Sequence, residues 1–193
     1  MINKVIQFLT DQLGKVLNQP GSPKNLLLTS VVNEKGELNI DAGQIAIMLV
    51  NIDEERALKA QLPRERRLAP DQIQFANPEI RLNLFIMLAA NPGGDNYNAA
   101  LERLSIAMLF FQGNSFFDRK KFSALAVEPV IEQISVELHS LSFEQQNQLW
   151  GSLGAKYLPS AIYKVRVAIM ADTSFGTTVP AIKILDHDLQ RIN

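Results

Sequence analysis

The sequence predicts an α+β or α/β fold in which helices pack on one mixed or antiparallel sheet. Three observations lead to this prediction. The chain opens with a helical apolar pattern, continues with strand-like apolar segments at 44–52 and 79–90, and returns to a helical pattern at 97–112. Its 193 residues, 47% of them hydrophobic, are enough for one domain with a large core. Periodicity alone does not decide between the two fold classes.

The first element is predicted to be a helix that ends near Asn18. Its apolar residues recur at steps of three and four from Ile2 to Leu17. Such a stripe packs against a core or a partner, or it lies on a membrane surface. The polar side carries both Lys4 and Asp11 and is not enriched in basic residues, which favours core or partner packing.

Several strands are predicted to follow this helix. The segment 26–33 is strand-like, 33–36 is a hairpin-type turn with a glycine, and 37–40 is the returning arm. The run 44–52 is nearly all apolar, which is typical of a central strand covered on both faces. In 79–90 the residues alternate between two faces, so one face is predicted to lie in the core.

Two segments are predicted to lie outside the regular elements of the domain, which we place at 1–171. Segment 53–77 is long and charge-rich, and we predict a projecting loop or arm that includes the arginine cluster at 64–67. Loops of this length in a compact domain usually have a function. Segment 172–193 is predicted to be a C-terminal extension that is partly flexible, with one short added strand as an option.

The helix predicted at 97–112 is apolar on nearly all sides, and Phe110 and Phe111 lie near its end. A helix of this kind is buried on more than one side, either by its own domain or by a neighbouring subunit. A strand is predicted next, at 130–138.

A third helix is predicted to begin after Ser142. Ser142 and Gln145 have the spacing of a capping box, in which two side chains satisfy free amide donors at a helix start. Phe143 and Trp150 are predicted to face the core, and Gly154 is placed to end the helix.

The strand predicted at 161–171 has two different sides. Tyr163 and Val165 point one way, and Lys164 and Arg166 point the other. We therefore expect the first side in the core and the second side against solvent or a partner.

Composition excludes several classes of function. A net charge of −1 argues against a general nucleic-acid binder, which needs an excess of basic residues. The chain has no cysteine, so disulfide and thiolate chemistry are excluded. Its longest apolar runs are far shorter than the roughly 20 residues that span a bilayer, so direct membrane insertion is not expected.

No reaction centre is visible in the sequence. The glycine-containing turn at 91–95 follows a strand and precedes a helix, as in phosphate-binding loops, but it lacks their lysine and their spacing. Glu137 and His139 share a strand face, but no further residue has a metal-ligand spacing. We therefore predict a protein that is not an enzyme, with no catalytic residue, cofactor or metal.

Seven segments nevertheless resemble one family, and they occur in its order along the chain. They lie at 49–56, 78–84, 89–91, 97–101, 110–112, 149–160 and 163–166. The resemblance is to the tail-terminator or cap proteins of contractile injection systems, the phage-tail-like particles of the Photorhabdus virulence cassette and antifeeding prophage type. The run LWGSLGAKYLPS, followed by Tyr163-Lys164-Val165-Arg166, is the most specific.

The resemblance implies a phage tail-terminator-like fold and a structural role. Six copies would form a ring that ends the inner tube and contacts the last sheath layer. The implied partners are further copies in a homo-hexamer, the inner tube protein and the sheath protein, with no nucleic acid and no membrane insertion. The implied location is the cytoplasm during assembly, within a particle that is then released or anchored. The partner-contact candidates are Arg56, Arg64, Arg66, Arg67, Phe110, Phe111, Lys164 and Arg166.

Two alternatives belong to other classes of protein. An adaptor would anchor the particle to a membrane or another host structure through the first helix. A small enzyme would use the turn at 91–95 or His139.

Overall fold

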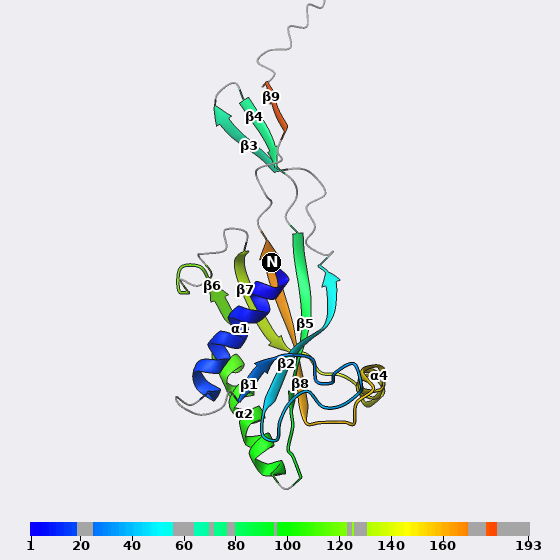
Figure 1. Ribbon diagram of the computed structural model, residues 1–193. Coiled ribbons are helices and arrows are strands. Elements are labelled where there is room, and N and C mark those ends of the chain that lie inside the picture. The colour runs from blue at the N-terminus through cyan, green and yellow to red at the C-terminus, as the bar shows by residue number, and fades with distance from the viewer. Residues whose placement is uncertain are drawn as a thin grey trace, which may run out of the picture.

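A six-stranded sheet is the centre of the computed structural model (Figure 1). The structure describes residues 1–18, 25–55, 64–69, 72–76, 80–94, 96–122, 125, 131–169 and 177–180. The strands lie in the order β1-β2-β5-β8-β7-β6, and only the β1–β2 pair is parallel. The predicted mixed sheet with helices packed on it is therefore confirmed. The strands are β1 Leu26–Leu28, β2 Ile45–Glu54, β5 Ile80–Ala90, β6 Phe116–Asp118, β7 Ile131–Leu138 and β8 Ser160–Ile169.

The two central strands are β5 and β8, which pair over ten positions. On β5, Leu84, Ile86 and Leu88 face one layer of the core, while Met87 and Ala89 face another. This alternation matches the prediction for 79–90. A strand with apolar residues on both sides needs cover on both faces, and this explains its central place in the sheet.

Helices α1 (Ile2–Leu17) and α2 (Tyr97–Gly113) cover one face of the sheet. The predicted stripe of α1 is buried in this layer, except for the exposed Val16. Asn18 ends the helix, and its side-chain oxygen accepts hydrogen bonds from the backbone N–H groups of Asn25 and Leu26. The apolar side of α1 is thus used by the protein's own core.

One side of α2 packs inward and the other does not. Its buried residues are Ala100, Leu104, Ala107 and Phe111. Tyr97, Leu101 and Met108 have the same helical spacing as these residues, yet the structure leaves them exposed, together with Leu109. The inward side of α2 is therefore narrower than its sequence pattern indicates.

Among the residues that the structure describes, the loop at 29–41 and α4 (Phe143–Leu153) cover one end of the opposite face of the sheet. The capping box is present, with Ser142 Oγ accepting from the Gln145 N–H and Gln145 Oε1 accepting from the Ser142 N–H. Gly154 has the predicted left-handed conformation, with φ of +65°. Trp150 is buried, as predicted.

Phe143 was predicted to face the core, and this prediction is wrong because its side chain is 92% exposed. The residues of α4 that contact the core layer come from the C-terminal half of the helix, at Leu149, Trp150 and Leu153. The first turn of α4 therefore extends beyond this core layer, although the helical spacing predicts that Phe143 contacts it.

A second sheet of three strands has the order β3-β4-β9 (Figure 1). Strands β3 (Arg64–Ala69) and β4 (Gln72–Ala76) lie in the segment predicted as a loop or arm. Strand β9 (Thr177–Pro180) is the optional strand of the C-terminal segment, and it pairs with β4. The arm thus contains regular strands, while the division at residue 171 remains a prediction.

Strand β1 is shorter than predicted. It ends at Leu28, and the expected returning arm contributes only an isolated bridge between Val32 and Leu38. The turn between them is present, with Gly36 at φ of +78°.

Within the described ranges, no helix is long and apolar enough to cross a membrane.

Candidate functional site

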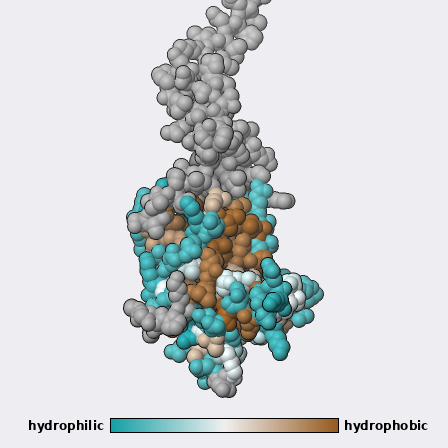
Figure 2. Space-filling view, viewed as in Figure 1, coloured by the Kyte–Doolittle hydropathy of each residue, from teal (hydrophilic) through white to brown (hydrophobic). Residues whose placement is uncertain are grey.

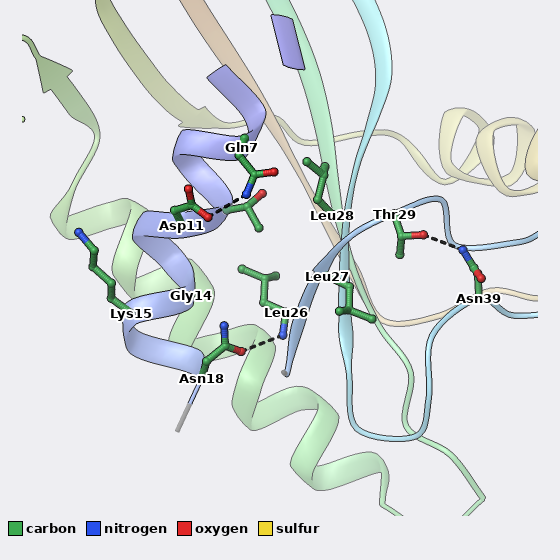
Figure 3. Close-up of a pocket in the computed structure, with 11 residues that line it drawn as sticks. Gln7, Asp11, Gly14, Lys15, Asn18, Leu26, Leu27, Leu28, Thr29 and Asn39 are labelled. Carbon is green, nitrogen blue, oxygen red and sulfur yellow. Dashed lines mark hydrogen bonds between the residues drawn. The ribbon is translucent and has the colours of Figure 1, made fainter. Parts of the chain in front are cut away.

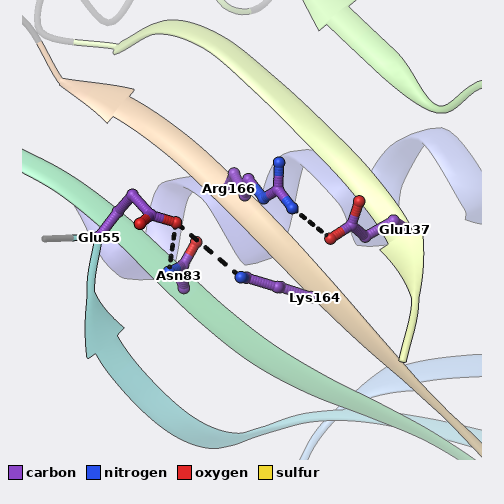
Figure 4. Close-up of polar contacts among 5 residues, drawn as sticks. All are labelled: Glu55, Asn83, Glu137, Lys164 and Arg166. Atoms are coloured by element: carbon purple, nitrogen blue, oxygen red, sulfur yellow. Dashed lines mark hydrogen bonds and ion pairs between the residues drawn. The ribbon is translucent and has the colours of Figure 1, made fainter. Parts of the chain in front are cut away.

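The uncovered half of the sheet face opposite α1 carries a set of polar and charged side chains. Asn83 on β5 is the cross-strand partner of Arg166 on β8, and Lys164 is the partner of Glu137 on β7. Cross-strand partners lie on the same side of a sheet, so these side chains share one surface. We call the surface formed by Glu55, Asn83, Glu137, Lys164 and Arg166 the open face (Figure 4).

Two ion pairs organise the open face. Arg166 Nη2 lies 2.7 Å from Glu137 Oε1, and both side chains are about half exposed. Lys164 Nζ lies 4.0 Å from Glu55 Oε2, in a more buried position. Solvent-exposed pairs of this kind contribute about 0.2–1 kcal/mol to stability, so the fold does not depend on the Arg166 pair. These charges remain near enough to solvent to meet a partner.

Asn83 is the buried member of the open face. Its Nδ2 donates a hydrogen bond to Glu55 Oε2 at 3.2 Å, but its Oδ1 accepts none from the described residues. A buried acceptor without a donor costs about 1–3 kcal/mol. The amide therefore holds Glu55 in place, beside Lys164, at a cost to stability.

The face covered by helices has an apolar patch beyond α1. Figure 2 shows apolar side chains gathered beside this helix. They include Leu28 and Ile52, which are exposed, and Leu49 and Leu82, which are half-buried against the core. Exposed apolar surface that continues a core is typical of an interaction site.

A groove of about 710 Å³ lies between α1 and the outer edge of β1 (Figure 3). One wall is polar, with Gln7 donating a hydrogen bond to Asp11 at 2.8 Å. The other wall is β1, which has one neighbouring strand in the described part of the sheet. The Ile45 N–H of β2 donates to the Asn25 carbonyl and the Thr29 N–H donates to the Ile47 carbonyl of β2, so both bonds lie between β1 and β2. By the alternation of a strand, the main-chain groups of Leu26 and Leu28 point away from β2, toward the groove, where the Leu26 N–H donates to Asn18 Oδ1.

The partner-contact candidates from the sequence lie in different environments. Lys164 and Arg166 are on the open face, as described above. Phe110 is half-buried, whereas Phe111 is 1% exposed and its ring packs against Tyr163, so Phe111 is not available to a partner. Arg56 lies outside the described residues.

Three further candidates, Arg64, Arg66 and Arg67, are on β3 at the edge of the small sheet. The structure describes their backbone, and their side chains fall outside the described part. Sequence reasoning missed Glu55 and Asn83 as members of the open face. The missing signal was the register between strands, which pairs residues that are distant in the chain.

The two sites considered for an enzyme have structural explanations. In the turn at 91–95, Asn91 Nδ2 donates to the Ile40 carbonyl at 2.7 Å, and Asn91 Oδ1 accepts from the Gly93 N–H at 3.0 Å. Gly93 has φ of +62°, and a Cβ there would lie 2.6 Å from Ala42 Cβ. The glycine is therefore required by the turn, while Asp95 lies outside the described residues.

The proposed start of a metal site is also accounted for. Glu137 is paired with Arg166, and the His139 ring packs edge-on against Phe85 with centroids 5.1 Å apart. Across the residues that the structure describes, no group of three or more His, Cys, Asp or Glu side chains could hold a metal ion.

Comparisons with known proteins agree on one family. The family model described as the Pvc16 N-terminal domain matches residues 4–183. The fold is similar to the sheath/tube terminator of PVC, an extracellular contractile injection system, in its extended state, with a TM-score of 0.63 and 17% identity over 100% of this chain. It is also similar to the tube-terminating cap of the anti-feeding prophage, with a TM-score of 0.61 and 16% identity over 96% of this chain.

These similarities extend over only part of each solved chain. The chain covers 65% of the first solved chain and 60% of the second. At this level of identity the likeness concerns the fold. No curated protein matches the sequence.

Proposed function

Because the chain belongs to the Pvc16 N-terminal domain family, we propose that it is a structural cap that ends the inner tube of a contractile injection system and contacts the last sheath layer. The observation that carries this proposal is the agreement in fold with two terminator caps over nearly the whole chain. The family resemblance of the sequence motifs points to the same role. The proposed cap is not an enzyme and needs no cofactor.

The cap would consist of six copies in a closed ring. A ring of this kind uses head-to-tail contacts, so each copy needs two different surfaces that fit together. The exposed apolar side of α2 and the apolar patch at Leu28 and Ile52 support such contacts, because both remain uncovered in the single chain. Phe110, which is half-buried on α2, remains one of the residues that we propose to contact a neighbouring copy.

Contact with the sheath would use the groove between α1 and β1. Sheath subunits of the resembled particles link by exchanging strands, and an added strand pairs with unpaired main-chain groups at a sheet edge. The outer edge of β1 supports this role, because its main-chain groups face a groove that is open to solvent.

Contact with the end of the tube would use the open face. Lys164 and Arg166 offer charged groups on an uncovered sheet surface, and such groups fix the orientation of a partner more than its affinity. The arginines of the arm, at positions 56, 64, 66 and 67, would extend the contact to a neighbouring subunit. Assembly would take place in the cytoplasm, within a particle that is later released or anchored.

The adaptor alternative has less support. It requires α1 to offer its apolar side to a membrane, but residues on that side, including Val5, Leu9 and Leu13, are buried in the core. For the enzyme alternative, the polar groups at 91–94 and at Glu137 are occupied by structural contacts.

Native mass spectrometry of the purified protein, alone and with the tube subunit of its particle, tests the proposal. We expect a six-subunit ring, either alone or when tube is present. A monomer that does not associate with the tube subunit would overturn the cap function. Flotation with liposomes would then test the adaptor.

A further inference from the structure

The two edges of the six-stranded sheet carry opposite charge. Where β2 ends, segment 51–55 holds three acidic residues and no basic residue, and its Glu55 is paired with Lys164. Where β6 ends, segment 118–121 holds one aspartate and three basic residues, a net charge of +2. We call 51–55 the acidic edge and 116–121 the basic edge. Asp53, Lys120 and Lys121 are exposed.

Both segments lie at true edges of the sheet. Strand β1 pairs only with residues 45–47, so the rest of β2 has β5 as its one neighbouring strand in the described sheet. Strand β6 is the last strand on the other side. Unpaired strand edges are templates for pairing with another chain, and charges near them decide which chain is accepted.

The acidic edge and the start of the basic edge also lie at the same position along the strand direction. A single row of cross-strand partners crosses the sheet from one edge to the other, and Figure 1 shows the ends of β2 and β6 on opposite sides of it. A lateral step from one copy to the next therefore brings Asp53 level with Phe116, and the basic residues follow shortly after Phe116. The row consists of Asp53, Asn83, Arg166, Ser135 and Phe116.

Each edge also has an exposed apolar side chain. Ile52 is 45% exposed at the acidic edge, and Phe116 is 48% exposed at the basic edge. Exposed charges alone contribute little affinity, so burial of these two side chains would add attraction while the charges fix the direction of approach.

We infer that the acidic edge of one copy meets the basic edge of the next copy. This inference rests on the proposed ring and adds a charged contact between neighbouring copies to the apolar surfaces named for it above. The occupant is a second copy of this chain because the chain itself carries both members of the complementary pair at opposite edges, and the row from Asp53 ends at Phe116, where the basic edge begins. Two different edges that meet give a head-to-tail contact, and such contacts close into rings.

Charge exchange tests the contact. Asp53→Lys alone and Lys120→Glu alone place like charges across the contact, and each should raise the concentration at which the ring half-dissociates by about threefold or more at low salt. The combined variant Asp53→Lys/Lys120→Glu restores opposite charges and should return this concentration toward the parent value. Lys35→Glu, in the exposed turn at 33–36, is the matched control and should leave it unchanged. If the combined variant instead half-dissociates at a higher concentration than either single variant, this result would contradict the inference.

Crosslinking supplies a second test that does not depend on the strength of the contact. The chain has no cysteine, so Asp53→Cys/Lys120→Cys introduces the only two thiols. With a short bis-maleimide linker we expect a ladder of covalent multimers, no ladder from either single variant, and none from Asp53→Cys/Lys35→Cys.

The outcomes separate the inference from the proposed function. If native mass spectrometry shows a six-subunit ring but crosslinking of the double-cysteine variant gives no ladder, the inference is wrong and the cap function still stands. A covalent dimer from a single-cysteine variant also overturns it, because an edge would then meet its own copy. Absence of any ring, with or without tube subunit, overturns both.

Discussion

Phe111 of α2 and Tyr163 of β8 pack ring against ring, with centroids 4.9 Å apart and planes tilted by 49°. Both side chains are buried, so this contact joins the helical layer to a central strand of the sheet. Phe111 is therefore part of the core, although its sequence context also suits a contact with a neighbouring subunit.

The hydroxyl group of Tyr163 should make stability depend on alkaline pH. Burial raises the pKa of Tyr163 from 10.0 to about 12. The pKa of Tyr163 is higher in the folded state than in the unfolded state. Its contribution to the free energy of unfolding is therefore complete below pH 10 and is lost as the pH rises to about 12, by roughly 2–3 kcal/mol in all. Urea unfolding of the parent and of Tyr163→Phe across this range measures it. Equal pH dependence in the two proteins would contradict this assignment.

Phe111→Ala should lower the free energy of unfolding by about 3–5 kcal/mol, because it opens a cavity in a fully packed layer. Phe143→Ala removes the same ring from a position that is 92% exposed and should change stability by less than about 0.5 kcal/mol. Chemical denaturation compares the two variants. A mild effect at Phe111 would place that ring at the surface instead.

Ser142→Ala should lower stability by about 1 kcal/mol because it removes one half of the capping box of α4. Trp150 is the one tryptophan of the chain and lies on this helix, so its fluorescence follows α4 directly. Ser152→Ala, on the same helix but away from its start, is the control. If both variants lose the same stability, the cap is not the cause.

Lys164→Gln/Arg166→Gln should weaken binding to the tube subunit by about tenfold while leaving the fold intact. The reason is that both side chains project from the open face, and the Arg166 pair adds little to stability. Titration by interferometry gives the affinity, with Lys35→Gln as the control for the loss of surface charge. Unchanged affinity would remove the open face from the proposed contact.

Reversal of the arm charges, in Arg64→Glu/Arg66→Glu/Arg67→Glu, should reduce the fraction of six-subunit rings seen by native mass spectrometry. The same three substitutions to Lys keep the charge and serve as the control. Ring assembly that is equal in both variants would show that the arm has no part in it.

The sequence was most informative where a pattern is local. The stripe of α1, the alternation of β5 and the Ser142–Gln145 capping box each depend on neighbours a few residues away, and the structure has all three. The exposed Phe143 shows the limit of such patterns, since helical spacing does not tell how far the layer beneath a helix extends.

The candidate site was predictable only in part, because it depends on register. Lys164 and Arg166 could be placed on one strand face from their spacing alone. Their partners Glu55 and Glu137 come from other strands, and pairing between strands follows from tertiary structure. The strands β3 and β4 were missed for a similar reason, since β4 also pairs with the distant β9.

The pairing of β5 with β8 has a consequence for synthesis of the protein. Ala89 pairs with Ser160, 71 residues later, and Ile80 pairs with Ile169, 89 residues later. Contacts this distant in sequence slow folding, because a long loop must close before they form. A nascent chain that has not reached Ser160 leaves one side of β5 without its partner and cannot complete the sheet. The six-stranded sheet, and any partner contact that uses it, can therefore form only after residues 160–169 have been synthesised.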